Sequence, residues 1–346
     1  MKILLDENKN FYKANLHCHS TNSDGRATPE DIKREYMARG YSVISYTDHE
    51  RILNMSHLND DGFLTITGGE LSIFDTEHQP FANDVKGAIS VIHFNLYAKD
   101  PENDVTPFSD AAHDTKCPEA IRDIVKYDGN YERIHTPEWV NYMTRRAHEL
   151  GFLISYNHAS WSLETASEYM QYDGFDFVEI FNTGCVKSGH VNDEHVFEDM
   201  LMAGKRVYCT AADDNHNIFG FDTPRSDSFG GYVMINAEKL EYGEIVGALE
   251  RGDFYSSNGG PDILSISVDG EVVTVKTAPA ARIFMRTNAR RGGVKFAEGE
   301  PLTEVRFKLL PEYKFFRIRV EGEDGKCSYS QAYFTEDFKE SGTAED

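Results

Sequence analysis

The chain is poor in cysteine and in positive charge. Its 346 residues include five cysteines, which are scattered and form no Cys-x-x-Cys pair. Neither a disulfide framework nor a cysteine-based zinc knuckle is therefore expected. Lys and Arg number 35 against 58 Asp and Glu, which gives a formal net charge of −23. We therefore expect no nucleic-acid polymer as a partner, whereas a small anionic substrate stays open because bound cations can reverse the local field.

Long apolar runs are also missing. No segment approaches the length of a membrane span, and the N-terminal stretch MKILLDENKNFYK has no sustained apolar region and no small-residue cleavage site. We therefore expect no membrane contact and a cytoplasmic protein. The length suits one barrel domain with a small appendage.

Short apolar segments recur along the first 260 residues, and most of them end in His, Asp or Glu. Their β-branched and aromatic content predicts buried strands. Helix signals fall between them, with a Thr-Pro start and a Gly stop at 28–40 and again at 136–151. This alternation predicts an α/β fold with a parallel sheet, namely a (β/α)7 barrel whose site collects at the carboxyl ends of the strands. The predicted strands are residues 14–19, 42–49, 63–70, 88–95, 152–158, 175–182 and 206–216.

Two segments depart from this pattern. Residues 96–135 are irregular and polar, and are interpreted either as a lid or substrate loop or as a tolerated surface insertion. Residues 261–336 alternate apolar and polar side chains around Asp-Gly turns, which predicts an antiparallel β-sandwich of unknown role. Residues 1–260 thus form the predicted barrel domain, and residues 337–346 a flexible acidic tail.

The strongest local motif is His17-Cys18-His19. Residues i and i+2 of a strand point to the same side, so both imidazoles converge on one point, as a divalent transition metal requires. Asp24 follows in a loop that can fold back over the strand end. Cys18 itself is interpreted as a small buried residue, with a ligand role as the alternative.

Further metal-ligating side chains close other predicted strands. A single buried histidine is more often a satisfied core residue, but several at the same end of consecutive strands would demand many hydrogen-bond partners in a small volume. The collective pattern therefore predicts a metal site. The motifs are Asp48-His49, Gly68-Gly69-Glu70, His93, Asn157-His158 and Asp213-Asp214-Asn215-His216.

In order along the chain, HCHSTNSDG, TPEDI, YTDHE, GGE, SYNH and DDNH resemble the motifs of the PHP (polymerase and histidinol phosphatase) superfamily. The resemblance covers residues 12 to about 260. It implies a distorted seven-stranded α/β barrel that holds two or three divalent metal ions (zinc, manganese or iron). The layout also resembles two-domain bacterial members with a C-terminal β-domain.

The resemblance implies a role for each matched residue. His17, His19, Glu70 and Asp214 would hold one metal; Glu70 would bridge to a second, completed by His93 and His158; Asp24, His49 and His216 would surround a third; and Asp48 would orient a ligand histidine.

Two of these positions depart from the family pattern. Asp24 stands where many relatives have a histidine, which weakens or empties the third site. His93 is matched by its place in a strand rather than by a strong motif, and His78 is the alternative.

The implied activity is that of a metal-dependent phosphoesterase, in which a metal-bridging hydroxide attacks the phosphorus of a small phosphomonoester. His216 or Asp24 would protonate the leaving oxygen. Lys187 and Arg225, in loops at the same barrel end, are candidate phosphate contacts, with solvated surface charge as the alternative. Trp161 is interpreted as a packing residue, with the pocket wall as the alternative.

The remaining histidines are interpreted as structural or surface residues: His113, His135, His148, His190 and His195. Two other functions stay open, a hydrolase of carboxylic esters or amides on the same metals and a catalytically inactive metal-binding module. The sequence does not decide the substrate, the metal or whether the chain forms a homo-oligomer.

Overall fold

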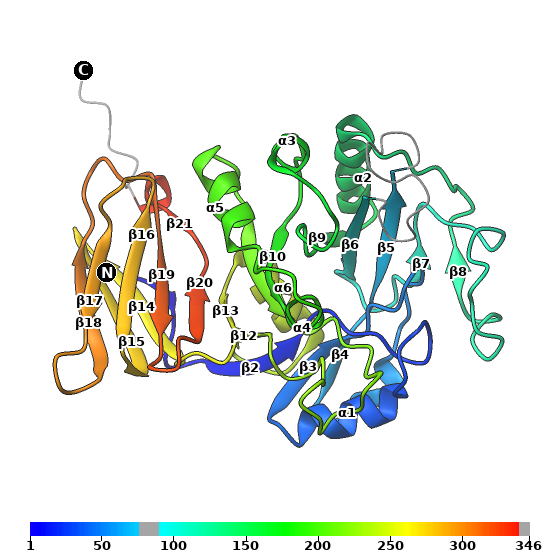
Figure 1. Ribbon diagram of the computed structural model, residues 1–346, viewed down its shortest axis with the longest axis horizontal. Coiled ribbons are helices and arrows are strands. Elements are labelled where there is room, and N and C mark those ends of the chain that lie inside the picture. The colour runs from blue at the N-terminus through cyan, green and yellow to red at the C-terminus, as the bar shows by residue number, and fades with distance from the viewer. Residues whose placement is uncertain (76–89, 339–346) are drawn as a thin grey trace.

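The computed structural model describes residues 1–75 and 90–338, which form a mixed α/β part and a β-rich part lying side by side (Figure 1). The α/β class expected from the sequence is confirmed. Among the described residues, no helix is long and apolar enough to cross a lipid bilayer. His78 lies outside the described residues, as does most of the predicted acidic tail.

The first sheet of the α/β part begins with three adjacent parallel strands, β2 (Asn10–Asn15), β3 (Tyr41–Ser45) and β4 (Leu64–Ile66). Two later strands extend it on the β2 side in antiparallel pairing, β12 (Tyr232–Ala237) and β13 (Phe254–Ser257). The strand predicted at 14–19 thus starts earlier and ends at Asn15, so that His17 and His19 lie beyond the strand end.

A second sheet holds the other predicted strands, in the order β11-β10-β9-β6-β5. Its members are β5 (Gly68–Phe74), β6 (Val91–Ala98), β9 (Phe152–Tyr156), β10 (Phe177–Asn182) and β11 (Tyr208–Ala212).

The expectation of all-parallel pairing is wrong at β6, which runs antiparallel to both β5 and β9. The start of β6, rather than its end, therefore lies level with the carboxyl end of β9. A buried apolar run does not encode this direction, because strands of either orientation can bury the same side chains.

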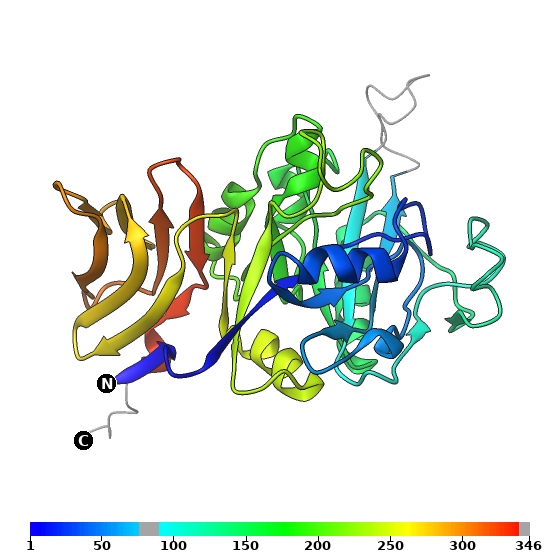
Figure 2. The ribbon, with the colours of Figure 1, turned by 90° about the horizontal axis from the view of Figure 1, so that it is seen from below.

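The helices cover the outer faces of these sheets (Figures 1 and 2). Both predicted Thr-Pro starts are confirmed, since the hydroxyls of Thr28 and Thr136 accept hydrogen bonds from the first turns of α1 and α2. Their apolar faces pack on the sheets through residues such as Ile32 and Val140, which are fully buried. The helices are α1 (Pro29–Met37), α2 (Pro137–Glu149), α3 (Ala166–Tyr169), α4 (Thr183–Lys187), α5 (Glu194–Met202) and α6 (Tyr242–Arg251).

The polar segment 96–135 extends away from the sheets on the α2 side of the molecule (Figure 1). Its regular structure is limited to the end of β6 and to a short parallel pair, β7 (Val105–Thr106) and β8 (Lys126–Tyr127). Phe108 packs against Trp139 of α2, with ring centroids 5.7 Å apart, so the segment is attached to the core at its base.

The β-rich part consists of two antiparallel layers. One layer has the order β1-β14-β15-β18, and the other contains β17-β16-β19-β20, with β21 beside β19. Apolar residues of both layers, among them Val275 and Ile318, form one buried cluster between them. The strands are β1 (Lys2–Leu5), β14 (Ile263–Asp269), β15 (Val272–Ala280), β16 (Arg282–Thr287), β17 (Gly293–Phe296), β18 (Leu302–Lys308), β19 (Phe315–Glu321), β20 (Cys327–Ser330) and β21 (Tyr333–Phe334).

The two parts are joined by strand pairing and by ion pairs. β20 pairs with β13, so that one ten-stranded sheet runs from the β-rich part into the α/β part. Near this junction the fully buried Arg317 of β19 donates to the carboxylates of Glu194 and Glu198 on α5. The first strand, β1, pairs with β14 of the β-rich part, whereas the next strand in the chain, β2, belongs to the first sheet of the α/β part.

Candidate metal centre

The structure brings all nine predicted ligand side chains together where the two sheets of the α/β part meet. They come from the loops after β2, β3, β9 and β11 and from β5 and β6, and their donor atoms form overlapping groups. The nine are His17, His19, Asp24, His49, Glu70, His93, His158, Asp214 and His216.

The innermost group surrounds His17 and His19, which are fully buried. Their Nε2 atoms lie 3.2 Å apart. Both face Asp214 Oδ1, at 3.2 Å from His17 Nε2 and 2.9 Å from His19 Nε2. Glu70 completes the group, since its Oε1 lies 3.2 Å from His17 Nε2 and its Oε2 3.4 Å from His19 Nε2. Two ligands on one tetrahedral zinc lie about 3.3 Å apart if each is about 2.05 Å from the ion, which is the spacing found here.

A second group shares the Glu70 carboxylate. Its Oε1 lies 3.1 Å from His93 Nδ1 and 3.5 Å from His158 Nε2. His93 reaches this point because β6, which is antiparallel to β5 and β9, has its first residues at the site. The ring of Trp161 covers both imidazoles, with centroid distances of 5.2 Å to His93 and 5.0 Å to His158.

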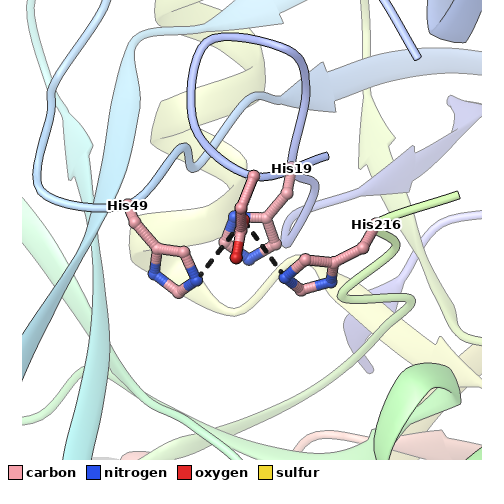
Figure 3. A group of neighbouring side chains, drawn as sticks. His19, His49 and His216 are labelled. Carbon is pink, nitrogen blue, oxygen red and sulfur yellow. Dashed lines mark ion pairs between the residues drawn. The ribbon is translucent and has the colours of Figure 1, made fainter. Parts of the chain in front are cut away.

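A third group is the most exposed to solvent. Figure 3 shows its three imidazoles, those of His19, His49 and His216, close together. In this group the Asp24 carboxylate lies between two imidazoles, with Oδ1 at 3.7 Å from His49 Nε2 and 3.4 Å from His216 Nε2. The His19 ring lies beside both imidazoles, with its centroid 4.3 Å from each, and those two centroids are 6.0 Å apart. The Asp24 side chain is 59% exposed, which makes it the most accessible of the four.

Tight backbone contacts hold the ligands in place. The loop after β3 runs along the start of β5, where Glu70 N donates to Asp48 O and Glu50 N to Glu70 O. Gly69 is required here, because a Cβ at this position would lie 2.0 Å from Arg51 O. Two ligands, His158 and Asp214, have positive φ angles of 27° and 51°. Such conformations cost free energy outside glycine and cluster at functional sites.

The predicted role of Asp48 is not the one that the structure shows. Its carboxylate accepts hydrogen bonds from Ser20 N at 2.8 Å and from the hydroxyls of Ser20 and Ser23, instead of contacting a ligand histidine. Asp48 therefore orders the loop that carries Asp24. The sequence motif placed Asp48 correctly beside the site but did not indicate which neighbour it would bind.

Glu179 of β10 is a site residue that the sequence reasoning missed. It is buried, and its Oε1 lies 3.1 Å from His17 Nδ1. Its other oxygen accepts from Asn182 Nδ2, which also donates to Asp214. When His17 Nδ1–H donates to Glu179, the Nε2 lone pair is left to face Glu70 and Asp214. The available signal was a lone carboxylate within the otherwise apolar run FVEIF.

The donor set fits a metal ion better than an empty polar core. His19 Nδ1 is buried and has no hydrogen-bond partner among the residues that the structure describes. A buried polar atom without a partner costs about 1–3 kcal/mol, and more when it is charged. A lone pair of His17 facing carboxylate oxygens is repulsive unless a cation lies between them. Histidine nitrogens and carboxylate oxygens are the ligands of first-row divalent ions such as zinc, manganese and iron.

Histidine pKa values show where negative potential gathers. Burial lowers the pKa of His17, but the carboxylates of Asp214, Glu70 and Glu179 outweigh this effect and raise it well above its usual value. Burial and the neighbouring imidazoles of His49 and His216 lower the pKa of His19 to about 3. The inner position therefore attracts positive charge, which a bound cation would supply in place of a proton.

The outermost group differs from the inner one because its own histidine, His216, carries the positive charge. Burial lowers the pKa of His216, but the carboxylates of Asp24 and Asp214 raise it to about 9. For Asp24, burial raises the pKa, yet the hydrogen bond from His216 and the charge of His49 hold it well below its usual range. Without a metal, His216 is thus an imidazolium paired with a carboxylate.

A cavity of about 380 Å³ opens beside the second and third groups. On the metal side it is lined by Asp24, His49 and His93, and Trp161 forms a side wall, as the alternative interpretation of this residue had it. The opposite wall comes from the polar segment 96–135, which therefore contributes to the site. The residues of this wall are His113, Asp114, Thr115, Lys116, Tyr131 and Arg133.

The predicted phosphate contacts Lys187 and Arg225 do not line this cavity. Lys187 Nζ donates to Pro224 O, and the Arg225 guanidinium lies over the Phe219 ring at 3.5 Å. Both residues follow the strands β10 and β11, as expected, but their side chains make these local contacts instead. Of the histidines interpreted as structural, His135 pairs with Glu164 and His148 with Asp176, whereas His113 lines the cavity.

No family model matches the sequence. Among curated proteins, 95 residues are 35% identical to an error-prone DNA polymerase of Cutibacterium acnes, a match that covers 26% of this chain and 8% of that one. A second match, 36% identical over 64 residues, is to a 5'-3' exoribonuclease of Haemophilus influenzae and covers 17% of this chain and 23% of that protein. The chain thus spans less than a quarter of either curated relative.

Two solved structures are similar in outline. One is a two-domain protein of Bacteroides vulgatus described as containing a predicted PHP-like metal-dependent phosphoesterase, with 15% identity, a TM-score of 0.46 and coverage of 95% of this chain and 96% of that one. The other, from Bifidobacterium adolescentis, is provisionally described as a metal-dependent phosphoesterase, with 13% identity, a TM-score of 0.37 and coverage of 68% and 96%.

Proposed function

We propose that the chain is a metal-dependent phosphoesterase of the PHP type that hydrolyses a small phosphomonoester. The observation that carries this proposal is the contact set of Glu70. Its Oε1 lies within 3.5 Å of His17, His93 and His158, and its Oε2 within 3.4 Å of His19 and His49. A carboxylate with both oxygens among ligand nitrogens is suited to bridge two adjacent ions, the arrangement that supports in-line displacement at phosphorus.

The residues that would hold the ions follow from the groups described above. His17, His19, Glu70 and Asp214 would bind one ion, Glu70, His93 and His158 a second, and His19, Asp24, His49 and His216 a third. When bound, divalent ions such as Zn, Mn or Fe supply activation of water and stabilisation of the charge that develops on the phosphoryl group.

The protein's own groups have two further tasks. Trp161 and the wall from segment 96–135 enclose the substrate beside the ligands, which limits the access of bulk water. In hydrolysis a water oxygen bonds to phosphorus, the bond from phosphorus to the leaving oxygen breaks, and that oxygen takes a proton. His216, whose pKa is raised to about 9 in the absence of metal, is the proposed donor when the third position is empty, with Asp24 holding its ring.

The experiment that tests this function is a substrate panel on purified protein with added Mn or Zn. Phosphomonoesters, phosphodiesters and aryl carboxylic esters are compared, with chelator-treated protein as the control. We expect metal-dependent release of inorganic phosphate from monoesters, lost in Glu70→Gln and retained in Glu312→Gln, which changes an exposed carboxylate between β18 and β19. Activity confined to carboxylic esters would contradict the proposal, and so would absence of bound metal.

The architecture around the site is part of the same proposal. We propose that the two sheets of the α/β part represent the distorted seven-stranded barrel, over about residues 1–260, and that residues 261–336 form a separate β-domain. The pairing of β1 with β14 assigns the first strand to that second domain. Limited proteolysis followed by mass spectrometry tests this division, since stable fragments that end near residue 260 would support it.

A further inference from the structure

The wall of the cavity that faces the metal ligands carries two cations that are not fully paired: Arg133, which is bound to Glu50, and Lys116. The chain as a whole has a formal charge of −23, so basic groups gathered at one place require a reason. Two of the cations on this wall or beside it are already neutralised. Arg51 donates to both oxygens of Asp114, at 2.7 and 2.5 Å, and His113 Nδ1 lies 2.8 Å from Asp110 Oδ1.

Arg133 is only partly matched. Its side chain is 3% exposed, and its Nη1 lies 2.6 Å from Glu50 Oε2 and donates to Ser72 O. Its Nε donates to Phe108 O. The remaining nitrogen, Nη2, is buried and has no hydrogen-bond partner within residues 1–75 and 90–338. Because an unpaired buried donor is costly, an anionic acceptor in the cavity would be stabilised there.

Lys116 is the second of these cations. It is exposed at the rim of the same cavity, and its ammonium makes no ion pair or hydrogen bond with any part of the chain that the structure describes. Tyr131, on the same wall, contacts both Arg133 and His113. Its ring stacks on His113 at 3.7 Å with an interplanar angle of 2°, and the Arg133 guanidinium lies 5.0 Å from its centroid.

Arg133 is also placed at a fixed position relative to the proposed metals. It binds Ser72 of β5, two residues after Glu70 and paired in register with His93, and it binds Glu50, which follows His49. A substrate held by its phosphoryl group at the ligands would therefore present its leaving group to Arg133 and Lys116. In this way the segment 96–135 adds an anion site to the metal site.

We infer that Arg133 and Lys116 bind a second anionic group of the substrate, a carboxylate or a second phosphate on the leaving group. This inference rests on the proposed phosphomonoesterase function and narrows its substrate class. The preferred substrate is then a phosphomonoester with a further negative charge on its leaving group. A plain sugar or alcohol phosphate would bind by its phosphoryl group alone.

Matched substrates test the inference on the metal-loaded full chain. 3-Phosphoglycerate is compared with glycerol 3-phosphate, which has a hydroxymethyl group in place of the carboxylate, and fructose 1,6-bisphosphate with fructose 6-phosphate. The first pair probes a carboxylate and the second a phosphate. We expect at least one pair to show a kcat/KM ratio of about tenfold or more in favour of the doubly charged member, the size of one charged hydrogen bond.

Variants then assign this preference to the two residues. Lys116→Ala, at an exposed position, should raise KM about two- to fivefold for the substrate with the second anionic group and leave KM unchanged for the counterpart that lacks this group. Arg133→Lys keeps the charge but removes Nη2, and should reduce the preference about tenfold. Lys295→Ala, an exposed lysine of β17, is the charge-matched control and should change neither substrate. Equal kcat/KM within both pairs, or a preference that survives in both variants, would overturn the inference.

Failure of the proposed function has a different signature. If no phosphomonoester is hydrolysed, that function is wrong, and the anion site is examined by calorimetric titration of the same compounds. Tighter binding of 3-phosphoglycerate than of glycerol 3-phosphate, weakened in Lys116→Ala, would still support the site. Equal affinity would refute it.

Discussion

Glu179 contacts Nδ1 of His17, whereas Nε2 of the same ring faces Glu70 and Asp214. Its position shows what a single sequence can and cannot indicate about a site. His17 and His19 were predictable because two histidines at i and i+2 have few other uses at a strand end. A carboxylate inside a strand, by contrast, gives no periodic signal of its partner. Lys187 and Arg225 were expected at the phosphate but do not line the cavity, for a related reason: a loop position does not indicate where a long side chain points.

Glu179→Gln is expected to weaken metal binding about 10- to 100-fold, the usual effect of removing the carboxylate behind a ligand histidine. The amide can no longer accept from His17 Nδ1 with a full negative charge, so the ring is held less firmly and becomes a poorer donor. Metal content after dialysis against a graded chelator measures the change. Glu312→Gln, at an exposed position, is the control, and unchanged affinity in Glu179→Gln would assign Glu179 a packing role only.

Asp24→Ala is expected to remove metal from the outermost group while the inner groups keep theirs. Asp24 contacts only His49 and His216 among the ligands and is largely exposed, so its loss leaves the Glu70 contacts intact. If the third position is filled in the wild type, elemental analysis of the purified variant should therefore show a lower metal content than that of the wild type. A loss of all metal would contradict the separation of the groups.

The element that most constrains the site is the start of β5, where the loop after β3 lies directly against the backbone. The strand itself was predictable from its apolar run, and so was Glu70 as its ligand. The direction of β6 was not, because the same buried side chains suit either orientation. The prediction of His93 rested on its position in an apolar run. His93 reaches the site because β6 is antiparallel to its neighbours, which the apolar pattern does not indicate.

Gly69→Ala is expected to destabilise the protein and weaken metal binding together. The new Cβ would lie 2.0 Å from Arg51 O, so the loop or the strand must shift and carry Glu70 with it. A loss of roughly 1–3 kcal/mol in unfolding free energy is the usual cost of overpacking at a buried position. Denaturant unfolding measures it. Gly243→Ala in α6, where a Cβ meets nothing within 4 Å, is the control and should be neutral or slightly stabilising.

The contact between α2 and the loop before β10 predicts a pH dependence. His148 Nε2 lies 2.9 Å from Asp176 Oδ2, and this hydrogen bond raises the pKa of His148 above its usual value. The stabilisation is therefore complete below the unfolded-state pKa of about 6.5 and is lost as pH rises through the higher folded-state value. Thermal unfolding of the wild type and His148→Gln between pH 6 and 9 should converge toward the alkaline end. A constant difference would contradict this assignment.

At the scale of the whole molecule, the three groups of candidate ligands lie where both sheets of the α/β part end. Their side chains therefore come from most of the strands of this part or from the loops that follow them. The two-part organisation could be predicted from the change from mixed to alternating patterns near residue 260. The placement of β1 could not, because the short run KILL gives no indication that it pairs with a strand some 260 residues later.

Metal removal is expected to lower thermal stability. Carboxylates and imidazole lone pairs that face one another at about 3 Å would lose the cation that separates them. A ligand that binds only the folded state stabilises it by RT ln(1 + [L]/Kd), which is about 4 kcal/mol at a thousandfold excess over Kd. Calorimetry with and without chelator measures this, and restoration by added Zn or Mn separates it from irreversible damage. An unchanged melting temperature would argue against tightly bound metal.

Arg317→Met is expected to loosen the junction between the two parts. The substitution leaves Glu194 and Glu198 without the buried cation that they share, and breaking such a pair costs roughly 3–5 kcal/mol. Differential scanning calorimetry should show a lower melting temperature, and a split transition if the parts then unfold separately. Arg290→Met, at an exposed position in the β-rich part, is the control.

The pairing of β1 with β14 also has a consequence for synthesis on the ribosome. Lys2 pairs with Val268, so 266 further residues must be synthesised before the partner of the first strand exists. At about 5–20 residues per second this delay is roughly 13–53 s. During that time an apolar N-terminal segment is exposed while the metal-ligating loops behind it are already being made. The nascent chain is therefore expected to depend on a holding chaperone, and pulse-labelling with chaperone capture would show whether that dependence ends when residue 269 emerges.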